Sequence, residues 1–114
     1  MSLTDDSRGA DGASDRTAST EDLIDLLSDE HAREILGAIR TESKSGRTLA
    51  AECGMSRTTV YRRLNRLREA GLVTGRMEYD SDGHHRRRFE VAVERVGIEL
   101  DESGFEAELA AEEA

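Results

Sequence analysis

One stretch of the chain, residues 47–73, constrains the fold most, because it shows two helical patterns and then the start of a strand. In its second half, Val60, Leu64 and Leu67 recur at the spacing of one helical face. Ser56 stands just before them, where its hydroxyl can accept hydrogen bonds from the free N–H groups of a first helical turn. The pattern predicts a helix over residues 56–70 with a buried apolar side.

A shorter helix precedes it, with Thr48 as its expected cap and with Leu49, Ala50 and Cys53 on one face. Gly54 follows directly, and glycine suits the left-handed residue that ends many helices. Two short helices joined by a tight turn form a helix-turn-helix, whose second helix enters the major groove of DNA. An ordinary helical hairpin with a solvated, arginine-rich face is the competing interpretation.

The outward face of the second helix carries side chains that can read base edges. If Val60 marks the centre of the buried side, a rotation of about 100° per residue directs Thr58, Arg62 and Asn65 outward. Tyr61 lies on the flank of that face. Arginine pairs with guanine and asparagine with adenine, and a threonine methyl can contact the thymine methyl. We therefore expect this helix to contact bases.

The charge pattern supports a nucleic-acid surface at the same place. The whole chain has 25 acidic and 16 basic residues and a net charge of −9, yet six arginines stand against one acid, Glu52, between positions 47 and 68. Residues 1–30 carry nine acids and two arginines, and residues 94–114 carry eight acids and one arginine. A local reversal of sign is the electrostatic footprint of a phosphate-binding surface.

Length and composition limit the class of protein. With 114 residues, 36% of them hydrophobic, the chain can build one small domain. No apolar run approaches the ~20 residues of a membrane helix, the N-terminus has no apolar signal core, and the single Cys53 fits a reducing cytoplasm. No nucleophile–base pair or phosphate-binding glycine loop indicates an enzyme. We expect a cytoplasmic protein that is not an enzyme and does not enter a membrane.

The basic residues are 15 arginines and one lysine, Lys44. High negative charge keeps a protein soluble, and halophiles use this property. Composition therefore favours a halophilic protein, and an ordinary acidic protein with disordered tails is the alternative. Because molar salt weakens phosphate contacts, DNA binding in such a cell must rely more on base contacts, shape fit and apolar burial.

The N-terminal third predicts a tail and two helical segments. Residues 1–19 have almost no large apolar residue, so we expect a disordered acidic tail. Residues 21–27 predict a helical turn capped by Ser19 or Thr20, and Asp29 predicts the cap of a helix that ends near residue 41. Surplus apolar surface on the first segment can dock on a second subunit, which makes a homodimer our expectation. That surface consists of Leu23, Leu26 and Leu27.

After a polar connector at residues 42–46 and the two short helices, residues 73–93 change to a period of two, with a turn at Asp80–Gly83. This predicts a β-hairpin behind the recognition helix, which is the layout of a wing. Arginines of the hairpin can reach backbone phosphates or a minor groove. The alternative is a charged edge strand that prevents aggregation. The arginines concerned are Arg76, Arg86 and Arg88.

Residues 94–114, an acidic C-terminal extension, leave two interpretations open. Apolar residues alternate on both sides of the turn sequence DESG, which predicts a second hairpin and is the interpretation we favour. The sequence EAELAAEEA favours a C-terminal helix from Ser103 instead. The alternating residues are Val96, Ile98 and Leu100 before the turn and Phe105, Ala107 and Leu109 after it.

Residues 21–93 resemble the winged helix-turn-helix regulators of bacteria and archaea, especially the ArsR-type repressors and their relatives in halophilic archaea. The resemblance rests on the opening L-S-D…R-x-I-L helix, which starts at Leu27, and on the pattern S-x-x-T-V-x-R-x-L…L-x-E-A-G-L-V from Ser56 to Val73. It implies an α+β fold, a helical bundle followed by a β-hairpin wing, over residues 20–93. It further implies a dimeric transcription regulator that binds double-stranded DNA in a sequence-specific way.

By position, the family's major-groove contacts fall on the start of the second helix. Together with the outward-facing residues further along and the hairpin arginines, they make up the predicted DNA-binding set. The set is Ser56, Arg57, Thr58, Tyr61, Arg62, Asn65, Arg66, Arg76, Arg86 and Arg88. The alternative function is a winged-helix adaptor that joins proteins in a transcription or replication complex, which the acidic ends would suit.

The chain departs from the metal-sensing members of that family, which carry a cysteine motif or His and Asp pairs on terminal helices. Here Cys53 stands alone on an apolar helix face, as a core residue does. His84 and His85 fall in the hairpin turn and His31 near a helix start, without third and fourth ligands at suitable spacing. We predict no metal site and no cofactor.

Overall fold

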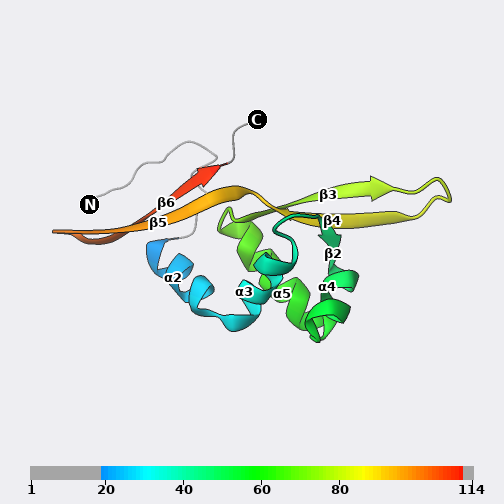
Figure 1. Ribbon diagram of the computed structural model, residues 1–114, viewed down its shortest axis with the longest axis horizontal. Coiled ribbons are helices and arrows are strands. Elements are labelled where there is room, and N and C mark those ends of the chain that lie inside the picture. The colour runs from blue at the N-terminus through cyan, green and yellow to red at the C-terminus, as the bar shows by residue number, and fades with distance from the viewer. Residues whose placement is uncertain (1–18, 112–114) are drawn as a thin grey trace.

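The computed structural model of the chain describes residues 19–111, in which four helices, with one two-residue strand among them, precede two β-hairpins (Figure 1). This helical bundle with a β-hairpin wing confirms the predicted winged helix-turn-helix of the α+β class. The acidic tail predicted for residues 1–19 lies outside the described residues except for Ser19. The elements are α2 (Thr20–Ser28), α3 (Glu30–Ala38), β2 (Lys44–Ser45), α4 (Gly46–Cys53), α5 (Arg57–Glu69), β3 (Val73–Tyr79), β4 (His85–Val91), β5 (Val93–Asp101) and β6 (Gly104–Ala111).

The first two helices meet at Asp29, where the backbone is extended and the helix is interrupted. The Asp29 carboxylate accepts a hydrogen bond from the backbone N–H of His31 at 2.8 Å, and the Ser19 hydroxyl caps α2 in the same way. Both caps agree with the sequence. α3 ends at Ala38, earlier than predicted, because the buried Ile39 has left helical geometry and the chain turns towards β2.

The helix-turn-helix pair is built as its capping residues predict. Gly54 ends α4 with φ of 67°, in the left-handed region, and Ser56 caps α5 by accepting a hydrogen bond from the backbone N–H of Thr59 at 3.0 Å. α4 begins one turn before the expected cap at Thr48, because the Ser45 hydroxyl accepts from the Thr48 N–H instead. The extra turn brings the start of α4 close to α5.

The wing, β3 and β4, belongs to a three-stranded antiparallel sheet in the order β2-β4-β3. The two wing strands pair from Val73 with Val91 to Tyr79 with His85, and Gly83 adopts φ of 90° in the predicted turn. β2 was not predicted, since its two residues lie in the segment expected to be a connector. It forms through pairing of Lys44 with Phe89 on the distant β4.

The C-terminal residues form a second antiparallel hairpin, β5–β6, which is the strand alternative of the two left open. The backbone N–H of Ala107 donates to the Thr20 hydroxyl at 3.1 Å, which ties this hairpin to the start of α2. The two hairpins extend in opposite directions along the long axis of the molecule, with the helices along one side (Figure 1). The principal extents of 53 × 28 × 26 Å reflect this arrangement.

The core lies between the helices and the roots of the two hairpins. The apolar face of α5, Val60, Leu64 and Leu67, is fully buried there, as the helical spacing predicts. Leu23 and Leu26 of α2 are also buried in this core, and Leu27 packs against it. The surplus surface predicted on α2 is therefore wrong for Leu23 and Leu26, which are buried within their own chain, whereas Leu27 stays half-buried.

Among the described helices, none combines the length and the apolar character needed to cross a bilayer.

Candidate nucleic-acid interface

The outward face of α5 is exposed along its length. Thr58, Arg62 and Asn65 point to solvent, opposite the buried Val60. They lie on one side of a rigid helix whose other side is locked into the core, so their positions relative to the wing are fixed. This is the arrangement that allows a helix to place several side chains against a surface at once.

A cleft of about 430 Å³ lies beside this face, between the start of α5, the start of α4 and the tip of the wing. Among the described residues, those that line it include four arginines from three elements and no acid. Such a surface attracts anions, and arginine in particular pairs with phosphate oxygens. The lining residues are Ser45, Arg47, Thr48, Arg57, Tyr61, His84, His85, Arg86 and Arg87.

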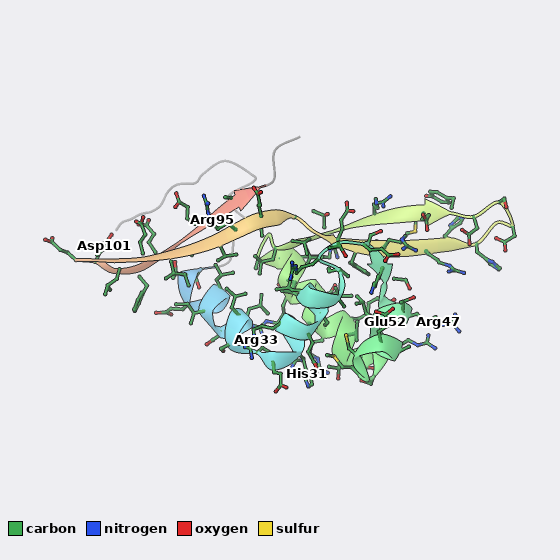
Figure 2. All side chains as sticks on the ribbon, in the orientation of Figure 1. His31, Arg33, Arg47, Glu52, Arg95 and Asp101 are labelled. Carbon is green, nitrogen blue, oxygen red and sulfur yellow. The ribbon has the colours of Figure 1, made fainter. Side chains whose placement is uncertain are left out.

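Local ion pairs leave this charge largely uncompensated. Within residues 19–111, Arg47, Arg57 and Arg87 make no ion pair. Of the acids near the cleft, Asp80 and Asp82 face Arg86 and His84 at the wing tip. Glu52 is held by the Lys44 ammonium at 2.6 Å, and this hydrogen bond raises the pKa of Lys44. Figure 2 shows Arg47 at the α4 side of the molecule, far from Arg95 on the acidic hairpin.

Tyr61 forms a contact between α5 and the wing. Its ring meets Phe89 of β4 edge to face, with centroids 6.3 Å apart, and it covers Gly46 at the start of α4. A Cβ at Gly46 would overlap the Tyr61 ring. The sequence placed Tyr61 among the DNA contacts. The side chain is 40% exposed, and the rest of it holds three elements together at the floor of the cleft.

The two faces of the wing differ sharply. Along β4, Phe89 points to the core, so Arg87 and His85 share the helix-facing side and line the cleft. Arg87 was not predicted, although counting back in steps of two from Phe89 would have identified it. Arg47 was not predicted either, because the sequence argument used it only in the net charge of residues 47–68.

The three predicted wing arginines point to the other face, where each faces a carboxylate. The N–O distances are 3.8 Å for Arg76–Glu90, 3.8 Å for Arg86–Asp80 and 3.5 Å for Arg88–Glu78. Arg88 also donates to the Ser43 carbonyl at 2.6 Å, which fixes the loop before β2. Only Arg86, near the tip, also lines the cleft. The structure thus separates Arg76 and Arg88 from the other predicted residues.

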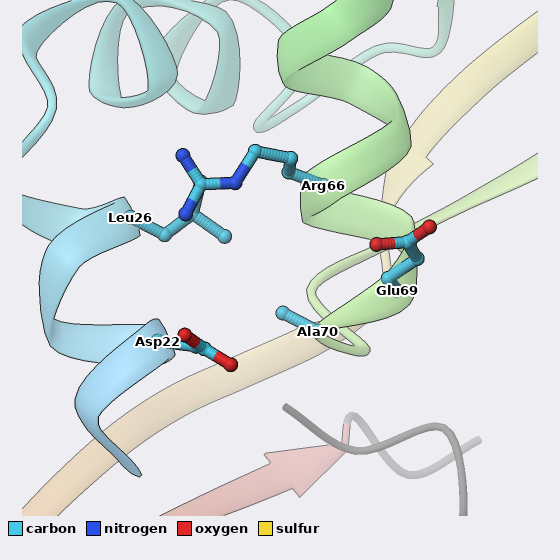
Figure 3. Close-up of a pocket in the computed structure, with 5 residues that line it drawn as sticks. All are labelled: Asp22, Leu26, Arg66, Glu69 and Ala70. Atoms are coloured by element: carbon cyan, nitrogen blue, oxygen red, sulfur yellow. The ribbon is translucent and has the colours of Figure 1, made fainter. Parts of the chain in front are cut away.

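Two further predicted residues, Ser56 at the cap of α5 and Arg66 within α5, have other neighbours. Arg66 lies on the flank away from the wing and lines a small cavity of about 170 Å³ with Asp22 and Leu26 of α2 (Figure 3). Ser56 uses its hydroxyl in the helix cap and also donates to the Thr59 hydroxyl at 3.0 Å. Of the predicted set, the structure therefore brings Arg57, Thr58, Tyr61, Arg62, Asn65 and Arg86 to one side.

An ion pair fixes α5 against α3. The Arg63 guanidinium donates to the Asp29 carboxylate at 2.7 Å, and both side chains are mostly buried. Partial burial raises the pKa of Asp29, but the hydrogen bonds from the backbone of His31 and Ala32 and from Arg63 outweigh it, so the pKa lies below its ordinary value. Asp29 therefore caps one helix and anchors another.

The wing tip brings together more potential ligands than the spacing argument allowed. Ligand atoms of Asp80, Asp82 and His84 lie within 4.8 Å of one another. All of them serve the turn, since Asp82 contacts the His84 ring at 3.1 Å and Asp80 faces Arg86. The absence of a metal site stays a prediction. Cys53 is half-buried against the core, and burial raises the pKa of its thiol, in line with a packing role.

Comparison with known proteins agrees with this architecture. Reduced HlyU from Vibrio cholerae N16961 is 20% identical, with a TM-score of 0.54 over 69% of this chain and 75% of its own. Mb0332 from Mycobacterium bovis, a homodimeric winged helix-turn-helix DNA-binding domain described as a possible ArsR-family transcriptional regulator, is 19% identical, with a TM-score of 0.54 over 75% of each chain. At this identity the likeness concerns the fold.

A search of curated proteins gives no match. The family model "HVO_A0261 N-terminal domain", however, matches residues 20–85, which is more than half of the chain. The match covers the helices, β3 and the wing turn. The chain therefore belongs to the HVO_A0261 N-terminal domain family.

Proposed function

We propose that this protein is a transcription regulator that binds double-stranded DNA in a sequence-specific way. α5 lies in the major groove, where Arg62 and Asn65 contact base edges and Thr58 contacts a thymine methyl. The wing follows the adjacent backbone. The protein acts in the cytoplasm as a homodimer, and its acidic, lysine-poor composition suits a salt-rich cell.

The cleft between α4, α5 and the wing is the observation that carries this proposal. Its four arginines flank the exposed face of α5 on one side, where the phosphate backbone beside a major groove runs. Arg47, Arg57 and Arg87 contact phosphates in this arrangement. Contacts to phosphate position a protein on the duplex, and contacts to bases then select the sequence. The cleft and the α5 face divide these two tasks.

The homodimer is supported by the fold that this chain shares with Mb0332, whose winged-helix domain is homodimeric. A two-fold dimer presents two recognition helices to two half-sites, which are spaced about one helical turn or a multiple of it apart. Because both half-sites must match, the dimer reads a longer DNA sequence than one recognition helix reads alone.

The test is a fluorescence anisotropy titration. It compares a duplex from upstream of the protein's own gene with a shuffled duplex of equal length, from 0.1 M to 2 M KCl. Arg62→Ala should lose the preference for the native duplex, costing about 1–3 kcal/mol if Arg62 contacts a base. Arg57→Ala should weaken both duplexes alike.

Arg95→Ala is the matched control, since it removes the same charge from the acidic hairpin on the other side of the molecule. It should leave both affinities unchanged. Equal affinity of the wild type for the two duplexes at every salt concentration would reject sequence-specific recognition. An adaptor that contacts proteins would then be the better proposal.

A further inference from the structure

The C-terminal hairpin presents a row of apolar side chains on one face, and only half of that row is covered. The cross-strand pairs Val96–Leu109, Ile98–Ala107 and Leu100–Phe105 lie in register. Near the helices, Val96, Ala107 and Leu109 pack against the core. Near the turn, where the hairpin extends beyond α2 (Figure 1), Ile98 is 44% exposed, Leu100 71% and Phe105 60%.

We propose that this distal apolar face, formed by Ile98, Leu100 and Phe105, is the surface on which a second copy of the chain docks. The inference rests on the homodimer of the proposed function and assigns its interface. It replaces Leu23 and Leu26 of α2, which the core already buries. Three large apolar side chains together in solvent are costly to hydrate, and burial against a like surface removes that cost.

The distribution of charge favours a second copy over other occupants. Strand alternation places the paired acids of this hairpin, Glu99, Asp101, Glu106 and Glu108, on the face away from the apolar row, and Glu99 lies directly opposite Glu106. Two copies stacked through their apolar faces therefore carry their acids outward. Packed sheets lie about 10 Å apart, so the acids of the two copies are separated by more than the Debye length of about 8 Å at physiological salt. Their mutual repulsion is therefore largely screened. Nucleic acid, by contrast, is repelled by so acidic an element.

The rest of the printed chain offers no apolar segment for this face. Residues 1–18 contain Met1 and Leu3 as their only large apolar residues, beside four aspartates, and residues 112–114 are Glu, Glu and Ala. A second copy of the chain offers a surface of matching shape and polarity, since a two-fold interface brings identical patches together.

Neighbouring surface must complete the interface, because stable dimers bury about 1,200–2,000 Å² in total. α2 is placed to contribute, since β6 packs against its start and the hairpin turn lies beyond it. Its residues Ile24 and Leu27 are half-buried in one chain. With the two hairpins antiparallel, the turn of each would lie next to α2 of the partner.

Sedimentation velocity of the full chain over a range of concentrations, in 0.1 M and 2 M KCl, tests the interface. The wild type should sediment as a dimer, at twice the 12.6 kDa of the monomer. The double variant Leu100→Ser/Phe105→Ser should raise the dimer dissociation constant about 100-fold or more, because two large apolar side chains leave the contact. The control Glu99→Gln/Glu106→Gln, on the opposite face, should remain dimeric.

Circular dichroism at each condition shows whether the variants stay folded, and Leu100→Lys alone, at the most exposed position, gives a second disruptive change. A wild type that stays monomeric at all concentrations, or disruptive variants that dimerise like the wild type, would overturn the inference. The DNA titration separates it from the proposed function. If the protein is a dimer but binds no DNA, the interface stands and the proposed function fails. If it is a monomer that binds a specific duplex, the function stands and the interface fails.

Discussion

At the scale of single residues, two neighbouring arginines of the wing have opposite surroundings. Arg87 points to the cleft, and Arg88 points away from it, where it contacts Glu78 and the Ser43 carbonyl. The sequence shows only a run of arginines at 86–88, so the choice among them depends on which face of β4 meets the core. Phe89 decides this, because it is the buried residue of the strand.

This difference predicts opposite effects of the two alanine substitutions. Arg87→Ala should weaken binding to every duplex and reduce the slope of log affinity against log salt by about 0.9, as loss of one phosphate contact does. Arg88→Ala should leave that slope unchanged and lower the thermal midpoint, since it frees the loop before β2. Anisotropy and thermal melts of both variants decide the matter. Equal salt slopes for wild type and Arg87→Ala would remove Arg87 from the phosphate contacts.

Asp29 gives the second prediction at this scale, through its depressed pKa. Because its pKa is lower folded than unfolded, Asp29 contributes stability that is fully present above the unfolded value of about 3.9. That stability is lost as pH falls through the folded pKa. Asp29→Asn should lower the free energy of unfolding by about 1–2 kcal/mol at pH 7, because Arg63 loses its charged partner and the start of α3 loses a negative charge.

The difference between wild type and Asp29→Asn should then shrink as the pH falls from about 5 towards 2. Urea unfolding of both proteins at a series of pH values measures this difference in the free energy of unfolding. The titration of the other carboxylates is common to both proteins and cancels. Glu30→Gln, at the exposed residue that follows the cap, is the control and should show no such trend. A constant difference at all pH values would mean that the charge of Asp29 does not stabilise the fold.

At the scale of elements, the parts set by local interactions were predictable and those set by distant contacts were not. Gly54 ends α4 and Ser56 caps the start of α5, and both act on residues next to them in the sequence. These two helix ends therefore followed from residue type. β2 has two polar residues and exists only through pairing with β4. For the C-terminal residues the sequence allowed a hairpin or a helix. The hairpin forms because it packs on the start of α2 and on the core, which local sequence does not show.

The junction of α4, α5 and the wing can be tested through a glycine. In Gly46→Ala the new Cβ would displace the Tyr61 ring from its contact with Phe89. We expect DNA affinity to fall several-fold, because the displaced Tyr61 ring no longer holds the wing in its position against α5. Gly37→Ala in α3 is the matched control, since its Cβ meets open space. Unchanged affinity for Gly46→Ala would show that Tyr61 does not set the wing position.

At the scale of the whole molecule, positive and negative charges lie at opposite ends of the long axis. The arginine cleft lies between the helix-turn-helix and the wing, and the acids gather on the hairpin that extends the other way. The sequence showed both charge blocks. It could not show that Leu23 and Leu26 face inward while Leu100 and Phe105 face outward, because burial depends on which elements pack together.

This charge distribution predicts opposite responses of folding and DNA binding to salt. A net charge of −9 and the cross-strand pair Glu99–Glu106 oppose folding by repulsion, which added ions screen. The thermal midpoint of the wild type should therefore rise from 0.1 M to 2 M KCl. Glu99→Lys should raise it at low salt and lose that advantage at high salt, because the new attraction is screened in the same way.

DNA affinity must fall over the same range, since counterions compete for the phosphates that the cleft would hold. A salt-rich cell would therefore offer a stable fold whose binding depends on base contacts by α5 more than on charge. Thermal melts at 0.1, 0.5 and 2 M KCl, recorded beside the DNA titration, measure both trends. A midpoint that stays flat or falls would contradict adaptation to salt and leave the acids as ordinary solubilising residues. A rising midpoint with lasting preference for one duplex in 2 M KCl would show that α5 reads sequence under the conditions that stabilise the fold.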